Sequence, residues 1–237
     1  SSRGLGDVYK RQIYWGSAAL LNPTDPFPEL LVTEPWRPRR GTNAIRASIP
    51  MGNATDLTLV LGSDDAFTTL RTAGRLRTTW AEADLALVGA YRGDDASTLV
   101  GLDIRGTLGV GYWLEVAASS HAWRQPDLAV GIDYSFPVLE NLQLLAQYYR
   151  NGRGRTTPNP LRQLSATLTP ASDTEAPSPF APILGGLDYV MVSAQQIIAP
   201  ERTLSAALRT HLGDGSAVAI PTMTYTPLDW LQCSVSG

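Results

Sequence analysis

Apolar and polar side chains alternate most regularly in residues 127–152, DLAVGIDYSFPVLENLQLLAQYYRNG. From Leu128 to Phe136 every second residue is apolar, and after a short break at 137–141 the alternation resumes over 142–150. Successive side chains of a β-strand point to opposite faces, so the pattern predicts a hairpin with one apolar and one small or polar face. Each arm has the length of a tilted strand that crosses a bilayer, and most strands of soluble proteins are shorter.

The same alternation recurs along the chain and predicts about thirteen strands. Two long stretches, 21–42 and 151–186, lack it. Five prolines between 21 and 41 exclude a helix or a central strand there, and a short helix is expected only at 161–168. The predicted strands cover residues 12–20, 43–49, 56–62, 70–80, 84–92, 97–108, 112–122, 128–136, 142–150, 187–198, 202–212, 216–225 and the chain from 230 onward.

The lengths of the connections alternate as well. Both long stretches are odd-numbered connections, and every even-numbered connection is short. Outer-membrane β-barrels combine short periplasmic turns with longer outer loops in this way. In that orientation outward-facing aromatic residues lie near both rims, as in the aromatic girdles of membrane proteins. Trp80, Tyr112, Phe136 and Trp230 are expected at the periplasmic rim, and Tyr91 and Tyr148 at the outer rim.

Composition narrows the possible functions. The formal net charge of −3 over 237 residues gives no basic field for nucleic acid. The sequence contains no run of 18 apolar residues, so we expect no transmembrane helix. Cys233 is the single cysteine and the chain has two histidines, so we expect no metal and no cofactor. Residues 106–111, GTLGVG, lie between two predicted strands and do not open a helix, which excludes a dinucleotide-binding loop.

Three groups of residues resemble motifs of a family of porin-like outer-membrane proteins of Gram-negative bacteria. This family belongs to the same superfamily as the alginate-export channels. The three groups are YWG at 14–16 with NPTDPF at 22–27, GIDYSF at 131–136 with LLAQYYRNG at 144–152, and HLGDGS at 211–216 with Pro221 and Tyr225. His211 and Gln147 stand where this family usually has Asn and Glu. The resemblance implies an all-β fold, a transmembrane antiparallel up-and-down β-barrel that is only partly present.

The two ends of the sequence fit this expectation. Residues 1–12 resemble translated adapter sequence and are set aside as non-native. Residues 13–237 are expected to form an incomplete outer-membrane β-barrel domain, an internal fragment without its signal peptide and without some strands on both sides. We expect the bacterial outer membrane as its location, with outer-membrane lipid, lipopolysaccharide and small hydrophilic solutes as partners.

The predicted lumen face carries charged residues that have two interpretations. They could form a charged constriction that selects solutes. They could equally be a solvated wall of mutually paired charges, for example Arg105 with Asp103 or Glu115. The arginine excess in residues 70–80 favours anionic solutes. The pore-lining candidates are Arg46, Arg71, Arg75, Arg77, Asp103, Arg105, Glu115, Asp133 and Arg209.

The NPTDPF segment supplies two further candidates, Asn22 and Asp25. It is expected either to fold into the pore as a constriction or to cap the barrel mouth with Asx and proline turns. The function predicted from these features is passage of small hydrophilic solutes.

Three other classes stay open. One is a non-conducting outer-membrane barrel with a structural or adhesive role. A second is an outer-membrane hydrolase, for which Ser119, Ser120 and His121 are available but no third catalytic group is identified. The third is a soluble β-sandwich or surface adhesin.

Overall fold

The structure is a computed structural model of the chain. It describes residues 15–26, 43–63, 70–93, 96–120, 122–137, 142–156, 184–199, 201–228 and 231–236. The predicted helix at 161–168 and the adapter-like residues 1–12 lie outside these ranges. In the part of the chain that is described, no helix is long and apolar enough to cross a membrane.

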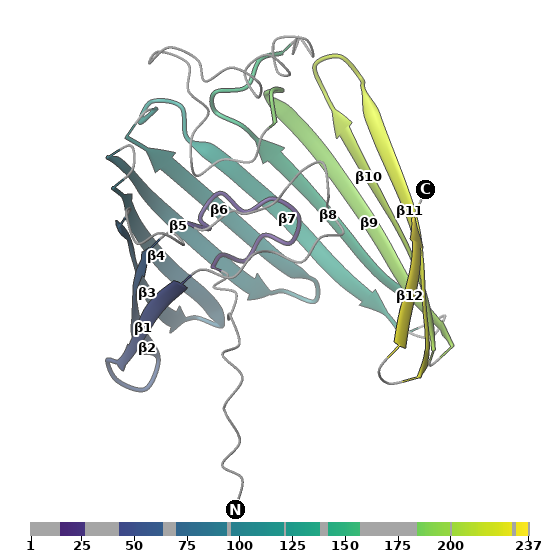
Figure 1. Ribbon diagram of the computed structural model, residues 1–237, viewed down its shortest axis with the longest axis horizontal. Helices are drawn as coiled ribbons and strands as arrows, with labels where there is room; N and C mark the ends of the chain where they lie inside the picture. Colours follow the sequence, from purple (N-terminus) through teal and green to yellow (C-terminus); the bar gives the residue numbers. More distant parts are fainter. Residues whose placement is uncertain are drawn as a thin grey trace, which may run out of the picture.

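Twelve strands form one antiparallel sheet in which each strand pairs with its neighbours in the sequence, from β1 to β12 (Figure 1). The fold is therefore an all-β up-and-down meander, curved as the wall of a partial β-barrel, with β1 and β12 at its two edges. A sandwich needs two packed sheets, and the described strands all belong to a single sheet. The strands are β1 Asn43–Pro50, β2 Thr55–Ser63, β3 Leu70–Trp80, β4 Ala83–Arg92, β5 Ser97–Thr107, β6 Gly111–Ser119, β7 Asp127–Phe136, β8 Leu142–Arg150, β9 Asp188–Ala199, β10 Arg202–His211, β11 Ala217–Leu228 and β12 Leu231–Ser236.

The strand prediction is wrong at two places. Residues 12–20 were expected to form the first strand, but residues 15–20 have no strand conformation, and the meander begins at β1. The expected turn at 226–229 begins later, because β11 continues to Leu228 across a register shift. The remaining predicted strands match β1 to β12 within a few residues.

The alternation along the strands separates two faces of very different polarity. Leu87 in β4 is 54% exposed, whereas the next residue, Val88, is completely buried. Leu102 in β5 is likewise exposed beside the buried Asp103. Residues such as Leu87 and Leu102 point to the convex side of the sheet, and residues such as Val88 and Asp103 point to the concave side. The convex face is thus apolar and open, and the concave face is covered.

The tightest hairpin joins β3 to β4 through Ala81 and Glu82 alone. Both residues have positive φ, at 50° and 63°, which is the geometry of a type I′ turn. The predicted Asp214-Gly215 hairpin between β10 and β11 uses Gly215 at φ 70°. Hydrogen bonds lower the pKa of the exposed Asp214 to about 2, those from Ser216 more than the one from His211. This turn is therefore anionic at neutral pH.

Four of the aromatic residues expected at the two rims of the sheet lie at the predicted ends of their strands. Trp80 ends β3 and Phe136 ends β7, and both lie at the rim with the short turns. Tyr91 and Tyr148 lie near the opposite rim. Trp80 is 73% exposed, and Phe136 packs edge-on against Tyr134 with ring centroids 4.6 Å apart. Trp230, the fourth aromatic residue expected at the short-turn rim, lies outside the described residues.

Gly131 in β7 allows a close approach that tests the packing of the concave face. A Cβ atom at this position would lie 2.2 Å from the Trp113 ring and 2.8 Å from the Ala146 carbonyl oxygen. We expect Gly131→Ala to lower the free energy of unfolding by about 1–3 kcal/mol, the usual cost of overpacking. Urea unfolding followed by circular dichroism measures this change.

Gly89→Ala in β4 is the matched control, because no atom lies within 4 Å of its added Cβ. Its free energy of unfolding should stay within about 0.5 kcal/mol of the parent value. Equal effects of the two substitutions would contradict the packing described here.

Candidate functional site

Residues 15–26, called here the inner segment, lie across the concave face of the sheet in front of the middle strands (Figure 1). This is the part of the chain that carries the WG and NPTD motifs. It has no strand conformation, and its backbone polar groups are bonded by side chains of the sheet and of the segment itself. The candidate site is the space between this segment and the strands behind it.

Local chemistry explains why this stretch is not a strand. Gly16 has φ 91°, a conformation that favours glycine, and an added Cβ would collide with the Asn22 side chain. Asn22 folds back over the segment, donating from Nδ2 to the Trp15 carbonyl oxygen. Its Oδ1 accepts the Thr24 backbone N–H at 3.1 Å and lies 3.1 Å from the Thr24 hydroxyl oxygen. The segment is therefore a closed loop, held by one asparagine.

Apolar side chains anchor the segment at two points. Trp15, 2% exposed, packs in a cluster with Val60, Ala73 and Val88 on strands β2 to β4. Ala18 and Leu21 belong to a second cluster further along the sheet. The concave face is thus not uniformly polar, because it offers apolar patches where the segment docks. The second cluster contains Ala18, Leu21, Trp113, Ala129, Tyr149, Tyr189 and Met191.

The Glu115 carboxylate of β6 is the main polar attachment. Its side chain is fully buried. Oε1 accepts the backbone N–H groups of Ser17 and Ala18, both at 2.5 Å. Oε2 accepts the Thr24 backbone N–H at 3.2 Å and the Thr24 hydroxyl at 2.9 Å. A buried charge is costly unless it is hydrogen-bonded, so Glu115 and the inner segment depend on each other.

Gln147 of β8 makes a second, two-way attachment. Its Oε1 accepts the Leu20 N–H at 3.1 Å, and its Nε2 donates to the Leu21 carbonyl oxygen at 2.8 Å. Gly101 of β5 makes room for the segment, since an added Cβ would lie 2.9 Å from Cγ2 of Thr24. Three neighbouring regions of the sheet are therefore shaped to hold residues 17–24.

Asn22 and Asp25, the two predicted constriction residues, are both in the inner segment and both buried, at 8% and 1% exposure. The amide of Asn22 shapes the segment itself, and the Asp25 N–H contacts the Asn22 carbonyl oxygen at 3.4 Å. The segment lies within the curve of the sheet and does not cap a rim. That it constricts a pore stays a prediction.

The charged candidates also lie on the concave face, where two of the arginines are paired. Arg75 contacts Asp103 at 3.2 Å, and Arg77 contacts Asp84 at 2.5 Å. The pairing expected for Arg105 is not the one found, because Asp103 pairs with Arg75 and Glu115 binds the inner segment. Arg46 and Arg209 lie apart from them on β1 and β10, and Arg71 shares β3 and its concave face with Arg75 and Arg77.

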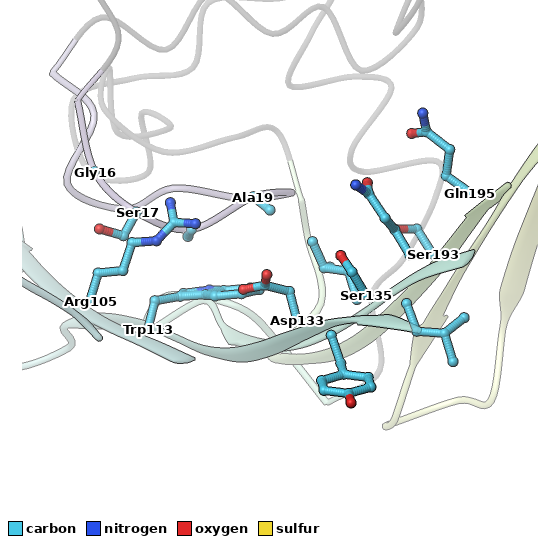
Figure 2. A pocket seen from close by; sticks show the side chains of 14 residues that line it. Gly16, Ser17, Ala19, Arg105, Trp113, Asp133, Ser135, Ser193 and Gln195 are labelled. Carbon is cyan, nitrogen blue, oxygen red and sulfur yellow. The ribbon is translucent and has the colours of Figure 1, made fainter. Parts of the chain in front are cut away.

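A cavity of about 340 Å³ opens between the inner segment and strands β5 to β9 (Figure 2). Arg105 and Trp113 lie at one end of it, with Asp133 beside them (Figure 2). Ser193 and Gln195 of β9 form the other end, and the segment's residues 16–19 close one side (Figure 2). Of the predicted pore-lining residues, only Arg105 and Asp133 border this cavity.

Sequence reasoning missed several residues of the site. Gln147 was predicted to face the lumen but was given no partner, Trp113 was assigned to a strand without a specific role, and residues 15–20 were assigned to the sheet. One signal was available: Trp15, Ala18 and Leu21 recur every third residue, and this spacing does not fit a strand with one buried face. The contacts of Gln147 with residues more than 120 positions away had no signal in the sequence.

Replacing Glu115 tests the attachment of the inner segment. In Glu115→Gln one carboxylate oxygen becomes an NH₂ group that faces N–H and hydroxyl donors. Loss of hydrogen bonds to a charged group typically costs about 1.5–3 kcal/mol. We expect hydrogen exchange at Ser17, Ala18 and Thr24 to become about tenfold faster or more, as mass spectrometry can measure.

Asp133→Asn is the control. It makes the same change from carboxylate to amide on the concave face, but no described hydrogen bond joins Asp133 to the backbone of the segment. Its exchange at residues 17–24 should match the parent chain. Unchanged exchange in Glu115→Gln would show that the apolar contacts alone fix the segment.

The described residues hold no group of three or more His, Cys, Asp or Glu side chains arranged to bind a metal. Of the possible hydrolase residues, His121 lies outside the described ranges, and the Ser120 hydroxyl accepts the Thr98 N–H at 3.1 Å. Comparison of the chain with protein-family models, with curated proteins and with solved structures gave no match.

Proposed function

We propose that this chain forms the wall of an outer-membrane β-barrel channel for small hydrophilic solutes. The observation that carries the proposal is the inverted polarity of the sheet. Its convex face exposes large apolar side chains, and its concave face carries buried or half-buried polar and charged ones. A soluble protein rarely exposes an apolar surface of this extent, whereas a membrane barrel requires one on its lipid side.

The apolar side chains of the convex face continue across the sheet from edge to edge. Neighbouring members are paired in register, for example Leu87 with Leu102 and Leu204 with Met223. They therefore form a band and are not scattered single residues. Its exposed members include Ile45, Leu59, Leu61, Leu76, Leu87, Val100, Leu102, Val130, Ile132, Leu144, Val192, Leu204, Leu208 and Met223.

Strand length and the rims support the same proposal. All strands from β2 to β11 contain 9 to 12 residues, about the length that a tilted strand needs to span the hydrocarbon core. Exposed aromatic residues such as Trp80 and Tyr91 lie near opposite rims, at the height of an interface. The resemblance of the WG…NPTD segment and of the β7–β8 hairpin to porin-like proteins agrees with this proposal.

The concave face supports passage of hydrophilic solutes. It combines paired charges, amides and hydroxyls with a cavity beside the inner segment. The Arg75–Asp103 and Arg77–Asp84 pairs neutralise two of the arginines that favoured anionic solutes. We therefore propose a hydrophilic pathway without assigning it a preference for anions.

A second candidate function is a non-conducting membrane barrel with a structural or adhesive role. The observation in its favour is the inner segment, which is fixed across the concave face by Glu115 and Gln147 and could close the pathway. Conductance separates the two. Purified protein reconstituted in a planar bilayer should give discrete current steps if it is a channel. Membrane-inserted protein without current steps would favour the non-conducting barrel.

Two adjacent residues of β10 test which face contacts lipid. Leu208 lies on the convex face at 44% exposure, and Ala207 lies on the concave face. An arginine on the lipid face of a barrel costs about 2–4 kcal/mol near the bilayer midplane. We expect Leu208→Arg to lower the free energy of unfolding in lipid vesicles by that amount, measured by urea titration.

Ala207→Arg introduces the same side chain one residue away but toward the wet side. Its cost should stay below about 1 kcal/mol, because the guanidinium keeps its hydration. If the two variants lose stability equally in vesicles, or if the parent chain stays in the aqueous phase without detergent, the membrane assignment is wrong.

A further inference from the structure

The cavity beside the inner segment has polar side chains at both of its ends. At one end are Arg105 of β5, Trp113 of β6 and Asp133 of β7 (Figure 2). At the other end are Gln143 of β8 with Ser193 and Gln195 of β9. Ser17 and Ser135 lie along the lining together with the apolar residues Ala18, Ala19 and Leu145. Its volume of about 340 Å³ is at the lower end of the range for small-molecule sites, about 300–1,000 Å³.

The charges of the lining cancel. Among the described residues that line it, Arg105 is the single cation and Asp133 the single anion, and the others are uncharged. An anionic solute placed between them would be attracted by Arg105 and repelled by Asp133. A cation would meet the opposite combination. The lining therefore favours a ligand without net charge.

Two buried polar atoms of the lining have unused hydrogen-bonding capacity. Trp113 is 2% exposed, and its Nε1–H has no acceptor among the described residues. Oδ1 of Asp133 is buried without a donor in the same part of the chain. One atom needs an acceptor and the other a donor, and a buried polar group left unpaired is costly. A hydroxyl group can supply either, because it both donates and accepts.

We propose that this cavity is a binding site for one small, neutral, polyhydroxylated solute of about the size of a single sugar ring. Hydroxyls of the solute pair with Asp133, Arg105 and the Trp113 N–H at one end. Other hydroxyls pair with Gln143, Gln195 and Ser193 at the other end. The site's role in solute passage rests on the proposed channel function, but binding itself does not.

A zwitterion such as an amino acid is the strongest competitor. Its carboxylate would pair with Arg105 and its ammonium group with Asp133. The amides and hydroxyls contributed by β8 and β9 would then face a side chain or stay unpaired. A polyhydroxylated ring satisfies both ends of the cavity at once, and for this reason the proposal commits to it.

Binding is tested with the full chain in detergent micelles, using D-glucose as the probe and saturation-transfer NMR as the measurement. D-glucuronate, with the same ring and an added carboxylate, and glycine, a small zwitterion, serve as comparison ligands. We expect D-glucose to bind about tenfold more tightly than either. Tighter binding of D-glucuronate or of glycine would overturn the assignment to neutral polyhydroxylated solutes.

Variants locate the site. Asp133→Asn keeps the size of the side chain but removes the charged acceptor, and it should weaken D-glucose binding about tenfold or more. Asp56→Asn is the charge-matched control, because Asp56 is on the concave side of β2, opposite Arg77 and away from the cavity. It should leave binding unchanged. Circular dichroism first establishes that both variants keep the strand content of the parent chain.

The outcomes separate this proposal from the channel function. Equal binding by the parent chain and Asp133→Asn, or no binding of D-glucose at all, would overturn the site even if the protein conducts. D-glucose binding that depends on Asp133 in a protein that gives no current steps would uphold the site and overturn the channel.

Discussion

The buried carboxylate of Glu115 is the interaction on which the interior of this structure depends. A buried carboxylate on the concave face, with Asp103 directly opposite it in the register of β5 and β6, is unfavourable without compensation. Arg75 compensates Asp103, and the backbone of the inner segment compensates Glu115. The segment in turn obtains from Glu115 the hydrogen bonds that a strand would obtain from its neighbour. The sheet and the segment therefore specify each other's positions.

This arrangement determines where solute chemistry can occur. The segment covers Trp113 and the apolar cluster around Tyr149, and it leaves a polar cavity along its edge. No described residue covers the convex face in this way, and its apolar band needs a lipid environment or a partner surface. The proposals for the two faces are linked, because a polar interior behind an apolar exterior is the arrangement of a barrel wall in a membrane.

Much of the fold could be predicted from the sequence, because alternation with a period of two reports directly which face each side chain occupies. This alternation predicted the β7–β8 hairpin and the order of long and short connections. It also predicted that Trp80 and Tyr91 lie at opposite rims of the sheet. The inner segment could not be predicted in this way. Its conformation depends on Gly16 and Asn22 and on contacts with Glu115 and Gln147, which are far away in the sequence and leave no local period. The cavity was missed for the same reason.

The central claim is that the convex face contacts lipid while the concave face contacts water. Spin labels at successive positions of β10, from 203 to 209, in a Cys233→Ser background reconstituted in lipid vesicles, test it most directly. Accessibility to oxygen should peak at 204, 206 and 208, and accessibility to a water-soluble nickel chelate should peak at 203, 205, 207 and 209. A uniform accessibility to the chelate along β10 would contradict the account.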